Sequence, residues 1–238
     1  MPSTSDTDLE SDAGAGSEPT DPVARAIRAF RDGEPVLVHD ADDREGETDI
    51  VYPAGSITAG AVAHLRNDAG GLVCVALGDR VAAALDLPFL DAVLDHPTAA
   101  DHDLAYDSRS SFSLPINHRE TFTGITDADR ALTIGKLADV AARIDAGEAY
   151  DVDDFSREFR SPGHVHVLRA AGGLLDERRG HTELGVALAR AAGLPPAAVV
   201  CEMLDDETGD ARSVVDARAY ARANGYVFVE GRDLVSGL

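Results

Sequence analysis

Tryptophan is absent from the 238-residue chain, lysine occurs only at Lys136, and cysteine occurs only at Cys74 and Cys201. Two cysteines so far apart in the sequence do not build a disulfide framework, so we expect a protein of the reducing cytoplasm. No apolar run approaches the roughly 20 residues that a membrane span requires. The N-terminal residues MPSTSDTDLE also lack the basic region and the apolar stretch of a secretory signal.

Positive charge is scarce as well, because 21 basic side chains stand against 43 acidic ones, for a formal net charge of −22. This charge repels phosphates, so neither nucleic acid nor an anionic membrane is an expected partner. An anionic small substrate would need a locally basic pocket or a cation. The acidic, arginine-dominated composition is typical of proteins adapted to high salt, and drift in a GC-rich genome is the alternative explanation. The 44% of hydrophobic residues excludes wholesale disorder.

The chain divides into a tail and one predicted domain. Residues 1–20 combine acidic and small polar residues without a positive charge, which predicts a disordered acidic tail. From 21 to 238, short apolar runs alternate with helix-like segments, which predicts one α/β (α+β) domain with a mixed sheet flanked by helices, and favours parallel pairing within it. The stretch 40–49 is predicted to be a loop too charged to be buried, and 88–110 an irregular polar section. The predicted strands are 35–39, 50–53, 72–77, 111–116, 164–168, 197–204 and 226–229, and the predicted helices are 22–33, 58–69, 79–87, a helix capped by Thr126 or Asp127, one capped by Thr182 and one capped by Asp216.

The segment from Arg44 to Asp49 carries three carboxylates and one guanidinium between two apolar strands. Carboxylates at alternate positions share a face and suit a hard divalent cation such as Mg²⁺. An exposed acidic turn is the alternative on spacing alone.

A second segment, Arg178-Arg179-Gly180-His181-Thr182-Glu183, precedes a predicted helix. Backbone N–H groups at a helix start bind anions, and arginine grips phosphate with two parallel hydrogen bonds. The alternative is a plain cap with exposed arginines. A carboxylate and an imidazole for a metal, with arginines for a phosphate, would together form a sugar-phosphate site.

Four further residues are candidates for chemistry. His164 and His166 share one strand face after a Pro-Gly turn, but without a third nearby ligand a transition-metal site is the less favoured interpretation. Glu202 lies in an apolar strand, where a carboxylate needs either a partner or a catalytic task. Cys74 lies in an apolar run, where a core position is the more common reading.

Taken together, these motifs resemble the 3,4-dihydroxy-2-butanone 4-phosphate synthase family of riboflavin biosynthesis, in its monofunctional, archaeal halophilic form. The family loop Asp-Arg-Glu-Asn-Glu-Gly-Asp is here Asp43-Arg44-Glu45-Gly46-Glu47-Thr48-Asp49. The other segments that carry the resemblance are Thr121-Phe-Thr-Gly-Ile125, Asp129-Arg130-Ala131, Ser161-Pro-Gly-His164-Val165, Arg178-x-Gly-His-Thr-Glu183 and Cys201-Glu202-Met203. The departures are Gly46, Thr48, Ala187 and His166, and the chain is too short for the C-terminal GTP cyclohydrolase domain that many relatives carry.

The resemblance implies conversion of D-ribulose 5-phosphate to 3,4-dihydroxy-2-butanone 4-phosphate and formate by enolisation, dehydration, a skeletal shift and expulsion of C4. It implies a lyase that uses Mg²⁺ or Mn²⁺, two ions per active site, and a homodimer. Glu45 and His181 are the implied metal ligands. Asp49, His164 and Glu202 are the implied catalytic residues.

The resemblance also implies a substrate-binding set and further candidates for the pocket. The substrate-binding set is Arg44, Glu45, Asp49, Arg178, Arg179, Gly180, His181, Thr182 and Glu202. The further candidates are Glu47, Cys74 and Thr123. Two alternatives stay open at this point: another metal-dependent sugar-phosphate isomerase or aldolase, and a non-enzymatic acidic binding protein.

Overall fold

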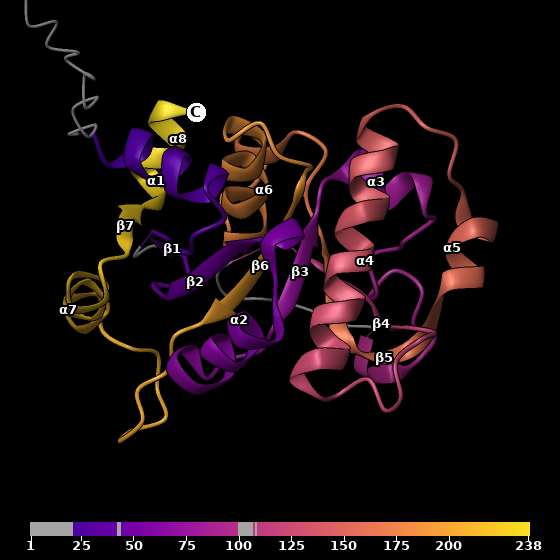
Figure 1. The fold of residues 1–238 in the computed structure, drawn as a ribbon, viewed down its shortest axis with the longest axis horizontal. Coiled ribbons are helices and arrows are strands. Elements are labelled where there is room, and N and C mark those ends of the chain that lie inside the picture. Colours follow the sequence, from indigo (N-terminus) through magenta and orange to yellow (C-terminus); the bar gives the residue numbers. More distant parts are fainter. Residues whose placement is uncertain (1–20, 42–43, 100–106, 108) are drawn as a thin grey trace, which may run out of the picture.

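The computed structural model describes residues 21–41, 44–99, 107 and 109–238, so the tail predicted for 1–20 and Asp43 lie outside the described residues. Within them, one seven-stranded sheet has the order β4-β5-β3-β6-β2-β1-β7 (Figure 1). The strands are β1 (Val36–His39), β2 (Thr48–Pro53), β3 (Cys74–Leu77), β4 (Phe112–His118), β5 (Phe159–Arg169), β6 (Ala197–Glu202) and β7 (Val227–Glu230). The predicted mixed sheet flanked by helices is confirmed.

Helices cover both faces of this sheet (Figure 1). Side chains alternate between two apolar cores, since Val36 and Val38 pack on one side and Leu37 on the other. The first core lies under α1 (Pro22–Arg31), α6 (His181–Ala191) and α8 (Gly231–Gly237). The second lies under α2 (Ala59–His64), the π-helical turn η2 (Leu65–Ala69), α3 (Asp79–Ala84), α4 (Asp127–Asp145) and α7 (Val214–Asn224). The chain therefore forms three layers, with strands buried between helices.

Some of the predicted N-cap residues are confirmed and others are not. Asp21 and Thr126 accept hydrogen bonds from the first turns of α1 and α4, as predicted. Thr182 does not cap α6, because Gly180 holds the N-cap position, and Ser213 rather than Asp216 caps α7. In both cases the helix begins earlier than the polar residue chosen from the sequence. Two short helices were not predicted, α5 (Val152–Glu158) and α8.

Two predictions about the sheet were wrong. Only β1 with β7 and β3 with β5 run parallel, and the other neighbouring pairs are antiparallel. The stretch 40–49 is not wholly an exposed loop, because β2 already begins at Thr48 and the side chains of Asp40, Thr48 and Asp49 are buried. Charge alone misled the prediction, since buried carboxylates are retained where they have partners or a task.

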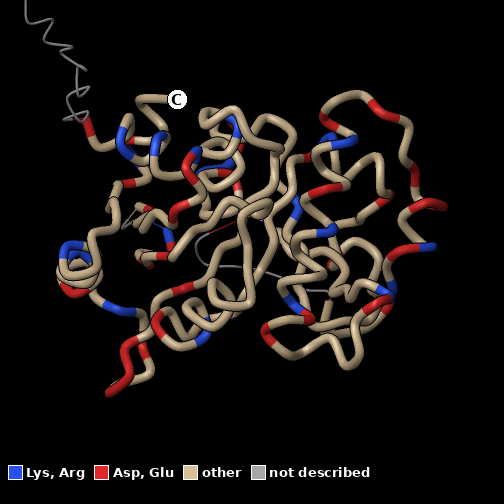
Figure 2. Tube along the Cα trace, in the orientation of Figure 1, with Lys and Arg blue, Asp and Glu red and all other residues tan. Residues whose placement is uncertain are grey.

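Acidic residues are spread over the outer helices and loops rather than gathered on one face (Figure 2). The loop after β6, residues 205–210, is largely exposed. No helix in the described part of the chain has the length and apolar character to span a bilayer.

Candidate active site

The start of β2 and the end of β6 bring two carboxylates together at one edge of the sheet. These strands pair antiparallel, and Asp49 lies directly opposite Glu202. Val51 and Val200, two positions along each strand, face the core beneath α6, so Asp49 and Glu202 point to that same side. The sheet register thus aims both carboxylates toward the first residues of α6, although Asp49 and Glu202 lie 153 positions apart along the chain.

Asp40 organises the loop that precedes β2. Its side chain is 1% exposed and accepts the backbone N–H of Glu47 at 3.1 Å and that of Glu45 at 3.4 Å. These hydrogen bonds fold the loop back on the end of β1, so that Glu45 and Glu47 face the same space as Asp49.

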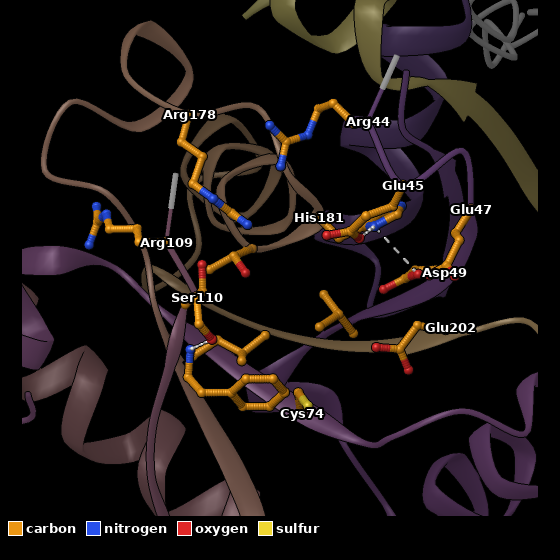
Figure 3. A pocket seen from close by; sticks show the side chains of 15 residues that line it. Arg44, Glu45, Glu47, Asp49, Cys74, Arg109, Ser110, Arg178, His181 and Glu202 are labelled. Atoms are coloured by element: carbon orange, nitrogen blue, oxygen red, sulfur yellow. Dashed lines mark hydrogen bonds and ion pairs between the residues drawn. The ribbon is translucent and has the colours of Figure 1, made fainter. Parts of the chain in front are cut away.

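Glu45, Glu47, Asp49 and Glu202 line a cavity of about 440 Å³ (Figure 3). Arg44 and Arg178 lie along one rim, and Asp49, Glu47 and Glu202 lie at the other side (Figure 3). The lining residues are Arg44, Glu45, Glu47, Asp49, Cys74, Arg109, Ser110, Ser111, Phe112, Leu168, Arg178, His181, Thr182, Val200 and Glu202. The cavity is therefore acidic at one side and basic at the other.

Asp40, Glu45 and His181 offer ligand atoms that all lie within 4.8 Å of one another. His181 Nε2 lies 3.2 Å from the carbonyl oxygen of Val38, and donation to that oxygen leaves Nδ1 turned toward the carboxylates. Nδ1 lies 3.6 Å from Glu45 Oε2 and 3.5 Å from Asp49 Oδ1. Among the described residues, that buried Asp49 oxygen has no hydrogen-bond partner. An orphaned buried oxygen beside an oriented imidazole and two carboxylates fits a divalent cation.

Burial and charge shift the titration of this cluster. Burial alone would lower the pKa of His181, but the carboxylates of Asp49, Glu45 and Asp40 outweigh it and raise that pKa to about 10. Burial raises the pKa of Asp49 well above that of an ordinary aspartate, and Glu202 and Glu45 add to the effect. A carboxyl group with a raised pKa holds a proton more readily than an ordinary aspartate, which suits it to proton transfer.

The thiol of Cys74 behaves differently from a nucleophile. Burial raises its pKa well above the usual range, so it stays protonated. We conclude that Cys74 lines the cavity as an uncharged side chain.

The basic rim is built on buried ion pairs. Arg178 Nη1 donates to Glu183 Oε2 at 2.6 Å, and Glu183 is fully buried in the first turn of α6. Thr182, the residue before it, is 4% exposed and lines the cavity. The first N–H groups of a helix have no partner within the helix, so the start of α6 adds anion-binding capacity beside the arginines.

Two glycines permit close approaches at this site. A Cβ on Gly71 would lie 2.4 Å from Glu202 Oε2, and a Cβ on Gly180 would lie 2.5 Å from Arg178 Nη1. The neighbouring N–H of Leu72 donates to the same Glu202 oxygen at 2.7 Å. The absence of a side chain at Gly71 therefore leaves room for Glu202, and that at Gly180 leaves room for Arg178.

A sequence model of the family described as 3,4-dihydroxy-2-butanone 4-phosphate synthase matches residues 24–236. The chain belongs to this family. It is 51% identical over 219 residues to the 3,4-dihydroxy-2-butanone 4-phosphate synthase of Archaeoglobus fulgidus, covering 88% of this chain and 91% of that one.

Solved structures of the family have the same fold. A crystal structure of a two-domain 3,4-dihydroxy-2-butanone 4-phosphate synthase from A. baumannii matches with a TM-score of 0.73 at 30% identity, covering 89% of this chain and 56% of that one. A family structure in complex with two magnesium ions matches with a TM-score of 0.69 at 33% identity, covering 89% and 93%.

Most residues that the family resemblance singled out meet in the cavity, but four do not line it. Gly180 lies behind Arg178, and Arg179 is exposed and lines a neighbouring cavity instead. His164 is exposed on β5, where its Nδ1 lies 3.1 Å from Asn117 Nδ2. Thr123 lies in the same neighbourhood, since its carbonyl oxygen is 3.4 Å from that Asn117 nitrogen.

Several residues of the site escaped the sequence analysis. Asp40 was included in a loop but not singled out, although it follows an apolar strand directly, which is a position that favours functional side chains. The segment Arg109-Ser110-Ser111-Phe112 lines the cavity from the start of β4. Its sequence signal was the same, a polar segment at a strand end, but Arg109 and Ser110 fell in the predicted irregular section 88–110, and Ser111 and Phe112 opened the predicted strand 111–116.

Proposed function

We propose that the protein converts D-ribulose 5-phosphate to 3,4-dihydroxy-2-butanone 4-phosphate and formate in riboflavin biosynthesis. The observation that carries the proposal is one cavity with an imidazole–carboxylate cluster at one side and two guanidinium groups at the other. A sugar phosphate has the matching polarity, with hydroxyl and carbonyl oxygens for the cluster and a phosphate for the arginines.

Asp40, Glu45 and His181 would hold a divalent cation, Mg²⁺ or Mn²⁺, with Asp49 beside them. Two ions per site are proposed, by analogy with the relative that was solved with two magnesium ions. When bound, such a cation stabilises negative charge that develops on the sugar oxygens. The proposal is supported by the orientation of His181, because the contact of Nε2 with Val38 turns Nδ1 toward Glu45 and Asp49.

The chain's own residues bind the substrate and move its protons. Arg44 and Arg178 hold the phosphate and orient the sugar toward the cluster. The carboxyl group of Asp49 accepts and returns a proton, because burial keeps its pKa raised. Glu202, fixed by the N–H of Leu72, serves a second proton transfer on the same side of the cavity as Asp49. Phe112, Leu168 and Val200 limit the access of water from the sheet side.

We also propose a homodimer in which His164 of one copy completes the cavity of the other. Within one chain, His164 does not line the cavity, yet its ring is held by Asn117 beside the loop Thr121-Phe-Thr-Gly-Ile125. That loop is rigidly built, because Asp129 accepts the N–H groups of three of its residues. It also presents Phe122, 94% exposed, and Ile125, 53% exposed. Exposed apolar side chains on an ordered loop are typical of an interface.

The function is tested by measuring formate from D-ribulose 5-phosphate with Mg²⁺, before and after EDTA. Formate production that depends on the metal supports the synthase. The same assay compares Glu45→Gln with wild type, and Glu148→Gln, the same substitution at an exposed position, is the control. Consumption of the substrate without formate would favour another sugar-phosphate enzyme. Binding without turnover would favour a non-enzymatic protein.

The dimer is tested by mixing two inactive variants, His164→Asn and Glu45→Gln. If sites are shared, random exchange of subunits recovers up to about one quarter of the wild-type activity, since half of the dimers then carry one intact site. No recovery after proven exchange would contradict the shared site.

A further inference from the structure

Asp107 connects the two arginines of the cavity rim. Its Oδ2 atom lies 2.8 Å from Arg44 Nη2 and 2.6 Å from Arg178 Nε. The three residues come from separate segments, before β2, before β4 and before α6. The carboxylate is enclosed, with a side chain that is 7% exposed.

One oxygen shared by two cations changes the electrostatics of the rim. Two guanidinium groups that approach the same substrate phosphate repel each other in its absence, and the repulsion is stronger in a partly buried site than in water. A carboxylate between them replaces this repulsion with two charge-assisted hydrogen bonds. The arginine pair is thus assembled before the substrate arrives.

The two arginines depend on Asp107 unequally. Arg178 has a second, fully buried partner in Glu183 at 2.6 Å. The other carboxylate near Arg44 belongs to Asp40, whose oxygen lies 3.8 Å from Arg44 Nε, beyond hydrogen-bond distance. Among the described residues, that Nε atom is buried without a hydrogen-bond partner. Loss of Asp107 would therefore leave Arg178 in place and release Arg44.

We infer that Asp107 is a positioning residue for substrate binding, which acts by holding the guanidinium of Arg44 beside that of Arg178. This inference rests on the proposed function, in which both arginines bind the phosphate. It predicts that Asp107 affects the affinity for the substrate rather than the chemical step, because its two hydrogen bonds are to the arginines, whereas Asp49 and Glu202 lie at the other side of the cavity (Figure 3).

The experiment compares KM and kcat for formate production in wild type, Asp107→Asn and Asp107→Glu, with calorimetric Kd values for inorganic phosphate. Asp107→Asn should raise KM and the phosphate Kd by about 10-fold to 100-fold, which corresponds to one lost hydrogen bond between charged groups. The kcat should stay within about threefold. Asp107→Glu, which keeps the charge, should lie between wild type and Asp107→Asn. Asp176→Asn, an exposed substitution of the same kind in the neighbouring cavity, is the control.

A second measurement asks whether Asp107 acts through Arg44. In an Arg44→Ala background, Asp107→Asn should change KM by less than about twofold, because the residue that it positions is already gone. A full effect in that background would overturn the inference, and so would a loss of kcat at unchanged KM. A lower KM in Asp107→Asn would overturn it as well, since the carboxylate would then compete with phosphate. If the wild type makes no formate, the proposed function fails, whereas the phosphate Kd values still decide the role of Asp107.

Discussion

Glu183→Gln removes the buried charge that anchors Arg178 while it keeps the size of the side chain. Glu183 is fully buried, and its two oxygens accept the N–H of Ala171 at 2.9 Å and Arg178 Nη1 at 2.6 Å. A glutamine has one carbonyl oxygen and one NH₂ group, so it keeps one of these bonds and turns a donor toward the other. Because Asp107 still binds the guanidinium, the loss is one hydrogen bond between buried charged groups rather than the whole pair.

The expected destabilisation is about 3 kcal/mol, at the upper end for a hydrogen bond to a charged group and at the lower end for a broken buried ion pair. For a chain of this length, a destabilisation of 1 kcal/mol lowers the melting temperature by about 2–4 °C, so we expect a fall of roughly 6–12 °C. Calorimetric melting of the substrate-free protein at fixed salt measures it.

The matched control is Glu177→Gln, six positions earlier in the chain. Glu177 is 53% exposed at its side chain, and its Oε1 lies 3.4 Å from Arg109 Nη2. An exposed pair of this kind contributes less than about 1 kcal/mol. Equal shifts for the two variants, or a Glu183→Gln protein that melts within 2–3 °C of the wild type, would refute the argument that burial makes this ion pair strong.

Four further outcomes are expected. Glu45→Gln and His181→Asn should lower formate production at least about 100-fold and weaken Mn²⁺ binding measured by calorimetry, whereas turnover with undiminished metal affinity would reject the ligand assignment. Deletion of residues 1–20 should leave activity and melting temperature nearly unchanged, because an acidic polar tail buries too little to offset its ordering entropy, and a large loss of either would show that the tail docks. The melting temperature should rise with NaCl and level off below molar concentration, since salt screens the net charge of −22, while a continued rise that favours sulfate would point to apolar burial instead. Burial lowers the pKa of His64, so the unfolded chain binds its proton first as the pH falls. That contribution to stability is present above about pH 6.5 and is lost below it, and His64→Gln should flatten the fall of melting temperature between about pH 6.5 and 5; an unchanged slope would contradict this.

The hydrogen bonds around His64 explain why it stays neutral in the folded protein. Nδ1 lies 2.7 Å from the hydroxyl of Tyr52, and Nε2 lies 2.7 Å from that of Tyr220, which donates to Asp68 at 2.7 Å. The ring accepts from one tyrosine and donates to the other, and a second ring proton would leave Tyr52 facing a donor.

The sequence by itself determined the features that depend on neighbouring residues. Alternating apolar positions located the strands, as Val165 and Val167 show, since both are fully buried while the histidines between and before them face the other side. Asp21 and Thr126 were identified as caps because a cap acts on backbone groups two or three positions away. The motifs around Glu45 and His181 also indicated a metal-assisted sugar-phosphate site, because the residue types within each short motif were enough to suggest the chemistry.

Only the tertiary structure decided how these segments meet. Asp49 faces Glu202 because β2 and β6 pair antiparallel across 153 positions of sequence, and no local pattern encodes that register. Asp49 is also buried beside His181 at the start of α6, although the sequence analysis placed this charged stretch in solvent, and burial raises the pKa of its carboxyl group. Asp107 binds Arg44 and Arg178 although it belongs to none of the recognised motifs, and His164 lies outside the cavity although it belongs to one. Burial, pKa and ion pairing are properties of distances between side chains, and those distances are set by the packing of the sheet against α6 rather than by the order of residues along the chain.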